Sequence, residues 1–328
     1  MSGRGRPDAG RGELAGIFVP VVTPFRTRTE ELDLSSFRAN VERLGRSPIR
    51  GVVVAGTTGE APFLGHDEKL SLVEAARDAL PADRLVLAGA GAESTREVVT
   101  LCAEAARAGA DYVLVKPPAF YRRAMTPAIL AQHYREVADA APLPVVFYIV
   151  PSSCASVEVS EGLVAELSTH PNIVGLKDSR GDLAALGAVI GRVPGEFRVL
   201  IGNGAKLYAA LEMGAAGGVL GIANVVPSEA ADLYESFVAG RLTEAGRIQE
   251  RIAPLHEEIV ARHGPPGVKA ALDLLGFGGG PPRRPFRRLD AKAVARIGEV
   301  LRGAGLLTSG ADPLTSDAGL LDTPGGAA

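Results

Sequence analysis

The stretch 172–179, NIVGLKDS, is a short apolar run that ends in Lys177. Lysine is seldom fully buried, and a buried ammonium is costly unless it is paired. Two ordinary explanations are a solvated strand end and an ion pair with Asp178 or Asp182. A third explanation is chemical. Desolvation disfavours the ammonium, so part of the population is a neutral amine that attacks a ketone and forms a Schiff base.

The other candidate groups at the ends of apolar runs are mostly hydroxyls. They are, in chain order, Thr23, Thr57, Thr58, Tyr121, Tyr148 and Asn203. A tyrosine beside a Schiff base can move a proton between lysine, water and a substrate hydroxyl. No acidic pair accompanies these groups, which disfavours glycoside hydrolysis.

The five histidines give little support for a metal site. The segment HEEIV at 256–260 lacks the second histidine that a zinc-binding HExxH helix requires. We therefore expect His256 and His263 on a solvated helix face, and we expect neither a metal nor a cofactor.

Eight apolar runs must position these groups. They begin at Gly16, Gly51, Leu85, Tyr112, Pro144, Ile173, Arg198 and Gly217. Alanine-rich amphipathic segments, such as 67–80 and 95–109, lie between them. This alternation predicts an α/β protein whose parallel strands are covered by helices on both faces. Eight units favour a closed (β/α)8 TIM barrel, in which active sites lie at the carboxyl ends of the strands.

The barrel is expected at 13–226, followed by a C-terminal helical extension at 227–307. Residues 1–12 and 308–328 are rich in Gly, Pro, Ser and Asp and show no periodicity, so both are predicted to be disordered tails. The arginines of RRPFRR at 283–288 are expected in a solvated loop.

Composition narrows the functional class. The chain has 328 residues, of which 46% are hydrophobic and 22% charged, and its formal net charge is -3. We expect no nucleic-acid partner, because basic residues form no stripe. We expect no membrane partner either, because no apolar run approaches ~18 residues. With two cysteines in the whole chain, a disulfide framework is unexpected, and a cytoplasmic location is predicted.

Four motifs stand in a recognisable order: GTTGE at 56–60, YIVP at 148–151, GLKD at 175–178 and PPGVKAALDLLG at 265–276. With them the chain resembles the dihydrodipicolinate synthase/N-acetylneuraminate lyase superfamily of lysine-dependent, class I pyruvate aldolases. The resemblance runs from about Leu14 to Leu307.

The resemblance implies roles for particular residues. Lys177 is the Schiff-base lysine, Tyr148 the proton shuttle, and Thr57 with Thr58 the clamp for the keto-acid carboxylate. The groups expected to bind substrate are Gly56, Thr57, Thr58, Ser153, Ser179 and Asn203. The resemblance also implies a homotetramer of two tight dimers and a substrate pair of pyruvate and an aldehyde.

Several stretches are most similar to 4-hydroxy-2-oxoglutarate aldolase, which yields pyruvate and glyoxylate; HPNIVGLKDSRGD is one of them. Three departures matter. Ser153 replaces the arginine of dihydrodipicolinate synthases, Phe120 replaces the usual relay tyrosine, and Thr57-Thr58 replaces Ser-Asn. Tyr121 is the candidate substitute for the relay.

Other functions remain open. The same Schiff base serves lysine-dependent dehydratases and hydratase-aldolases, which eliminate water, and a condensation like that of dihydrodipicolinate synthase. A ligand-binding barrel without turnover is the alternative outside enzymology. The identity of the aldehyde is also left open.

Overall fold

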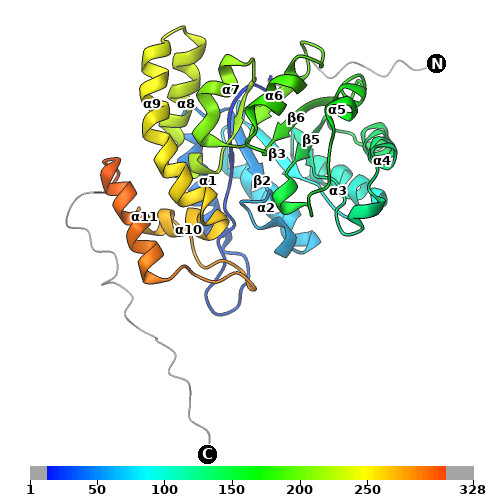
Figure 1. The fold of residues 1–328 in the computed structure, drawn as a ribbon. Coiled ribbons are helices and arrows are strands. Elements are labelled where there is room, and N and C mark those ends of the chain that lie inside the picture. Colours follow the sequence, from blue (N-terminus) through cyan, green and yellow to red (C-terminus); the bar gives the residue numbers. More distant parts are fainter. Residues whose placement is uncertain (1–12, 308–328) are drawn as a thin grey trace, which may run out of the picture.

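The computed structural model describes residues 13–307, and the tails predicted at 1–12 and 308–328 lie outside that range. In the described part of the chain, eight parallel strands follow one another around a closed barrel, and the eighth pairs with the first. Helices surround this barrel (Figure 1). The predicted (β/α)8 barrel is therefore confirmed.

The strands coincide with the eight apolar runs. Their bounds are β1 (Gly16–Pro20), β2 (Gly51–Val54), β3 (Leu85–Gly89), β4 (Tyr112–Val115), β5 (Val145–Ile149), β6 (Ile173–Asp178), β7 (Arg198–Ile201) and β8 (Gly217–Val219). Nearly every strand residue is buried, as expected when one face of the sheet lines the barrel interior and the other meets the helices.

The helices between the strands are α1 (Leu34–Gly45), α2 (His66–Ala79), α3 (Thr95–Arg107), α4 (Pro127–Ala140), α5 (Glu161–Leu167), α6 (Leu183–Ile190) and α7 (Leu207–Glu212). After β8 follow α8 (Pro227–Val238), α9 (Leu242–Leu255), α10 (Gly264–Leu274) and α11 (Ala291–Gly303). Several of these helices have an N-terminal residue whose side chain caps the first turn. The hydroxyl of Ser94, for example, accepts a hydrogen bond from the backbone N–H of Glu97 at the start of α3.

The boundary predicted between barrel and extension, at residues 226 and 227, stays a prediction. Helix α8 follows this boundary and packs against both β1 and α9. Beyond it, α9 continues into a π-helical turn (His256–Ala261), and α10 and α11 lie beside that turn (Figure 1).

The expectation of solvent-exposed histidines on this turn is wrong for His256. Its ring is buried against Gly204, and burial lowers its pKa to about 4. The side chain of His263 is also mostly covered and lies 3.7 Å from Glu258. The HEEIV pattern did not reveal that this turn packs onto the barrel.

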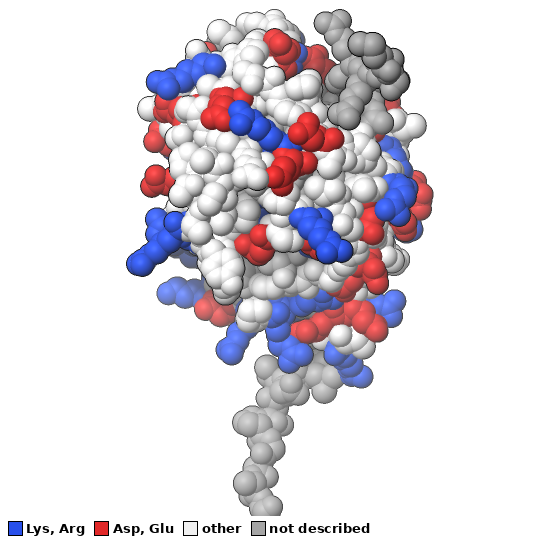
Figure 2. All heavy atoms as spheres, turned by 90° about the vertical axis from the view of Figure 1, so that its right-hand side faces the viewer, with Lys and Arg blue, Asp and Glu red and all other residues white. Residues whose placement is uncertain are grey.

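The surface carries mixed charge. Positive and negative side chains are interspersed, with uncharged surface between them, on the face that Figure 2 shows. Among the described residues, no helix is both long and apolar enough to span a bilayer.

Candidate active site

Lys177 lies in β6, and its register partner on the neighbouring strand is Tyr148. The lysine is 4% exposed, and its Nζ lies 4.1 Å from the centroid of the Tyr148 ring. Among residues 13–307 it forms no ion pair, because the adjoining Asp178 pairs with Arg180 at 2.6 Å. Neither ordinary explanation, a solvated strand end or an ion pair, applies to this lysine.

The hydroxyl of Tyr148 forms hydrogen bonds with several side chains. It shares a hydrogen bond of 3.4 Å with the Thr57 hydroxyl and also bonds to Ser179 and Lys177. Burial by itself raises the pKa of Tyr148. The charge of Lys177 and these hydrogen bonds outweigh burial, so the pKa lies below its usual value. A tyrosine in this state ionises more readily, as a proton shuttle requires.

The loop that carries Thr57 and Thr58 has unusual backbone geometry. Ala55 and Glu60, on either side of the two threonines, have φ angles of 52° and 58°. Such left-handed conformations cost free energy for residues other than glycine, and surrounding contacts must enforce them. One such contact is the hydroxyl of Thr23, which donates a 2.7 Å hydrogen bond to the carbonyl of Gly59.

Glu60 is held by the C-terminal part of the chain. Its carboxylate pairs with Lys269 of α10 at 2.5 Å, and it accepts a 2.9 Å hydrogen bond from the backbone N–H of Arg283. Lys269 is 1% exposed, and burial, opposed by the charge of Glu60, lowers its pKa to about 8. We call the set Glu60, Lys269 and Arg283 the C-terminal link.

Arg283 strengthens this link. Its guanidinium forms two hydrogen bonds with Glu68 and donates to the carbonyls of Glu30 and Phe63. The side chain is 15% exposed, so the expectation of a solvated arginine loop is wrong for this residue. The physical reason is a set of acceptors that come from the loops after β1 and β2 and from the first turn of α2, which the sequence around Arg283 does not show.

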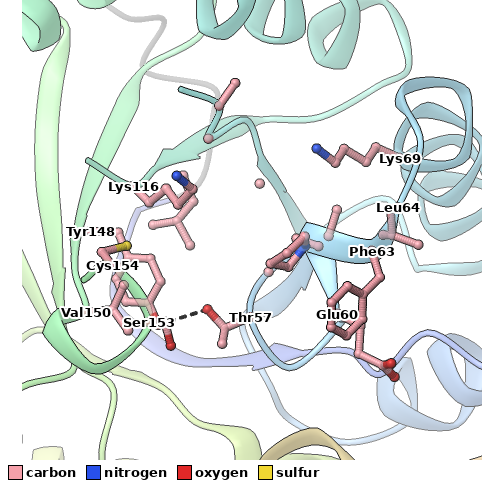
Figure 3. A pocket seen from close by; sticks show the side chains of 18 of the residues that line it. Thr57, Glu60, Phe63, Leu64, Lys69, Lys116, Tyr148, Val150, Ser153 and Cys154 are labelled. Carbon is pink, nitrogen blue, oxygen red and sulfur yellow. Dashed lines mark hydrogen bonds between the residues drawn. The ribbon is translucent and has the colours of Figure 1, made fainter. Parts of the chain in front are cut away.

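A cavity of about 580 Å³ opens beside this site (Figure 3). Of the predicted residues, Gly56, Thr57, Tyr148 and Ser153 line it. Lys177 and Ser179 are not part of the cavity wall. Both contact Tyr148, which is part of it. The C-terminal segment contributes Pro265 and Phe286 to its wall.

Three predicted residues lie away from this cavity. Thr58 faces the loop after β8, where a Cβ on Gly221 would lie 3.6 Å from its hydroxyl oxygen. The side chain of Asn203 caps a short turn by accepting a hydrogen bond from the N–H of Ala205. Tyr121 is 72% exposed and stacks edge-on against Phe120, with ring centroids 5.0 Å apart.

Two lysines and a carboxylate in the cavity wall were not predicted from the sequence: Lys69, Lys116 and Glu93. Lys116 and Glu93 pair at 2.7 Å, and Glu93 also accepts hydrogen bonds from the backbone N–H groups of Ala119 and Phe120. A signal for Lys116 was present. It ends the apolar run YVLVK in the same way that Lys177 ends its own run.

The arrangement suits covalent chemistry by an amine with proton transfer by a phenol. Residues 13–307 contain no group of three or more histidine, cysteine, aspartate or glutamate side chains placed to hold a metal ion. A buried amine in contact with a phenol, as in Lys177 and Tyr148, is an arrangement that can support Schiff-base formation with the phenol as acid and base.

Comparison with known proteins agrees with this geometry. The model of the dihydrodipicolinate synthetase family matches residues 13–303. A probable mitochondrial 4-hydroxy-2-oxoglutarate aldolase of Emericella nidulans is 35% identical over 295 residues, which cover 89% of this chain and 95% of that protein. A 4-hydroxy-tetrahydrodipicolinate synthase of Methanothrix thermoacetophila is 35% identical over 287 residues, covering 87% of this chain and 95% of the relative.

Solved structures show the same architecture. The crystal structure of dihydrodipicolinate synthase from Thermotoga maritima superposes with a TM-score of 0.85 at 29% sequence identity. The superposition covers 89% of this chain and 99% of that one.

Proposed function

We propose that this chain, which belongs to the dihydrodipicolinate synthetase family and is a class I aldolase, a carbon–carbon lyase, cleaves 4-hydroxy-2-oxoglutarate into pyruvate and glyoxylate. The observation that carries the proposal is Lys177, a buried strand-end lysine without an ion pair among residues 13–307, packed against Tyr148. The relative from Emericella nidulans, which bears this activity in its name, supports the choice of substrate.

The proposed cycle begins at the ketone. The neutral amine of Lys177 attacks C2, and loss of water gives an iminium ion. Tyr148 then removes the proton of the C4 hydroxyl, the bond between C3 and C4 breaks, and its electron pair moves into the iminium to form an enamine. Glyoxylate leaves as the aldehyde product. Protonation of C3 and hydrolysis release pyruvate and restore Lys177.

The remaining residues hold the substrate during these steps. Thr57 lies at the cavity and contacts the Tyr148 hydroxyl, which suits a clamp for the C1 carboxylate. We assign Gly56, in the same loop and also in the cavity wall, to this clamp, and leave out Thr58 because it faces the loop after β8. Ser179 keeps the phenol oriented, and Gly202 makes room for it, because a Cβ at that position would lie 1.9 Å from the Ser179 hydroxyl. Ser153, which lines the cavity, is assigned to the aldehyde half, whereas Asn203 is given no role here because its side chain caps a turn.

Borohydride trapping tests the proposal. Incubation of the protein with pyruvate and sodium borohydride is expected to add a reduced pyruvyl group to Lys177, detected by peptide mass spectrometry. Lys116 is the internal comparison, because it also ends a strand but is paired with Glu93. An active protein in which Lys177 stays unmodified would contradict the mechanism.

Water elimination is the second candidate reaction. It is favoured by the relay position, where Phe120 replaces the usual tyrosine and both Phe120 and Tyr121 are exposed in the single chain. Altered proton delivery would redirect the same iminium ion toward loss of a hydroxyl group. Product analysis by NMR on a panel of 2-keto acids separates the reactions, since cleavage releases pyruvate and an aldehyde. Condensation of the dihydrodipicolinate synthase type, the activity named for the Methanothrix relative, is less favoured because Ser153 is uncharged.

We also propose assembly as a homotetramer of two tight dimers, in the cytoplasm. Phe120 and Tyr121 are 79% and 72% exposed in the single chain, and exposed aromatic residues are enriched at subunit interfaces. Glu93 fixes the backbone of their loop through two N–H groups. This loop would then reach the neighbouring subunit's site and place the Tyr121 hydroxyl near Tyr148.

A further inference from the structure

Tyr148 lies between two lysines on adjacent strands. Lys177 of β6 is its register partner. On the other side, β4 pairs with β5 so that Val115 lies opposite Phe147, which places Lys116 beside Tyr148 at the next position. Neighbouring residues at the same level of a parallel sheet point to the same face, so Lys116 is directed toward the barrel mouth, as Tyr148 and Lys177 are. Figure 3 shows Lys116 close to Tyr148 and Cys154 in the cavity wall.

The side chain of Lys116 is held in place. Its Nζ pairs with Glu93 at 2.7 Å and donates to the carbonyl of Pro117 at 3.3 Å. Its stem lies over Gly91, where an added Cβ would approach Cγ of the lysine to 2.5 Å. An ammonium has three protons, and two of them are used by these partners. The third is available to a ligand in the cavity.

The charges in the wall leave a positive excess. Glu60 is committed to Lys269, and Glu93 to Lys116 and two backbone N–H groups. Lys69, which also lines the cavity, forms no ion pair in the described part of the chain. Burial, opposed by Glu97, lowers the pKa of Lys69, and the positive charge of Lys116 lowers it further. An anion between the two ammonium groups would relieve their repulsion.

We propose that Lys116 binds an anionic group on the aldehyde half of the substrate, and that the enzyme therefore selects aldehydes that carry a carboxylate. This inference deepens the proposed function and depends on it. Strands β4 and β6 are separated by β5, so their axes lie roughly 10 Å apart. A five-carbon keto acid bound at Lys177 through C2 has its C4 hydroxyl at Tyr148 and its C5 carboxylate on the side of Lys116.

Substrate discrimination tests the assignment. Two substrates are compared, 4-hydroxy-2-oxoglutarate and 4-hydroxy-2-oxopentanoate, in which a methyl group replaces the distal carboxylate. In Lys116→Met we expect kcat/KM for the dicarboxylate to fall by about 10- to 100-fold, the usual cost of losing a hydrogen bond to a charged group. For the methyl analogue we expect kcat/KM to change by less than about threefold, because this substrate has no distal carboxylate for Lys116 to bind. Lys116→Arg should restore most of the preference, because it keeps the cation.

Two further variants separate charge from structure. Glu93→Gln breaks the ion pair but leaves the ammonium, so the preference for the dicarboxylate should persist or increase. Lys292→Met removes one positive charge from the exposed start of α11 and should leave kcat/KM unchanged for both substrates. Equal losses for both substrates in Lys116→Met, or the same losses in Glu93→Gln, would overturn the assignment in favour of a structural role in the loop.

Borohydride trapping of pyruvate at Lys177 is measured in every variant. If Lys116→Met still traps pyruvate and its substrate preference equals that of wild type, the role of Lys116 is refuted and the aldolase mechanism stands. Failure of trapping in the wild type refutes the proposed function, and the inference about Lys116 with it.

Discussion

The ends of β4 and β6 present lysines to the same tyrosine in contrasting environments. Lys177 is 4% exposed, packs on the ring of Tyr148 and has no carboxylate partner among residues 13–307. The side chain of Lys116 is 27% exposed and is paired with Glu93. A neighbouring carboxylate favours the ammonium and so suppresses nucleophilicity. The two lysines differ in their surroundings rather than in their place at a strand end, and the roles that we propose, nucleophile for Lys177 and binding charge for Lys116, follow that difference.

The unpaired state of Lys177 has an energetic cost. A buried ammonium without a carboxylate is unfavourable, and contact with an aromatic face returns only about 0.5–2 kcal/mol. Stability alone would favour a hydrophobic residue at this position. A lysine at this buried position agrees with a chemical use, since costly desolvated groups are concentrated at active sites.

The largest effect is expected from Lys177→Arg. Arginine keeps the charge but does not lose its proton in a protein, so turnover and borohydride trapping should disappear. The matched variant Lys116→Arg should retain trapping at Lys177. Steady-state kinetics and mass spectrometry check both. Residual Lys177→Arg activity within about tenfold of wild type would contradict a covalent mechanism, because a lost nucleophile costs far more.

Tyr148→Phe comes next. The substitution removes the hydroxyl, with its hydrogen bonds to Thr57, Ser179 and Lys177, and keeps the packing of the ring. We expect kcat to fall by roughly 10²–10⁴, the range for a positioned proton-transfer group. A rate near that of wild type would assign the proton transfer to water or to Tyr121.

Tyr121→Phe should have a smaller effect on rate. A relay that acts through Tyr148 is expected to contribute roughly tenfold to kcat, below the usual range for direct transfer. Light scattering measured alongside kcat establishes whether the oligomer is unchanged. Full activity with an intact oligomer would show that the tyrosine serves only as an aromatic contact at the interface.

The smallest expected effect is a shift in the pKa of Tyr148 rather than a change in rate. Lys177 is a main cause of the lowered pKa of Tyr148, so Lys177→Met should raise that pKa. Tyrosinate absorbance during an alkaline titration, after subtraction of the Tyr148→Phe signal, reports it. Lys116→Met should leave the pKa of Tyr148 unchanged, because Lys116 is not among its causes. An equal shift in both variants would remove the electrostatic distinction between the lysines.

The barrel was predictable from the sequence because strands buried on both faces appear as continuous apolar runs. Each run, such as GVVV at 51–54, became one strand. The π-helical turn at 256–261 was not predictable, since its burial depends on contact with the loop after β8. The placement of Arg283 was missed for the same reason, because Glu68 lies 215 residues away along the chain.

The candidate site divides in the same way. Lys177 and Tyr148 were found from an apolar run and a motif, and the barrel topology brings them together. Lys116 gives the same local signal, but its environment depends on Glu93 from another loop. Asn203 was placed at a strand end correctly, yet its side chain is used to cap a turn. The type of a residue and its level in a strand are local properties, whereas its hydrogen-bond partners are not.

The C-terminal link has a consequence for how the protein is made. Glu60 follows β2, near the start of the barrel, and its partner Arg283 lies 223 residues further along the chain. At 5–20 residues per second, a ribosome needs roughly 11–45 s to add that length. Until Lys269 and then Arg283 are added, the carboxylate of Glu60 lacks these partners, and the loop that carries Thr57 and Thr58 has the Thr23–Gly59 hydrogen bond but not the C-terminal link. The contacts of the proposed carboxylate clamp are therefore completed only when α10 and the segment after it have been synthesised, and a chain halted before Lys269 would carry Lys177 and Tyr148 without the C-terminal link.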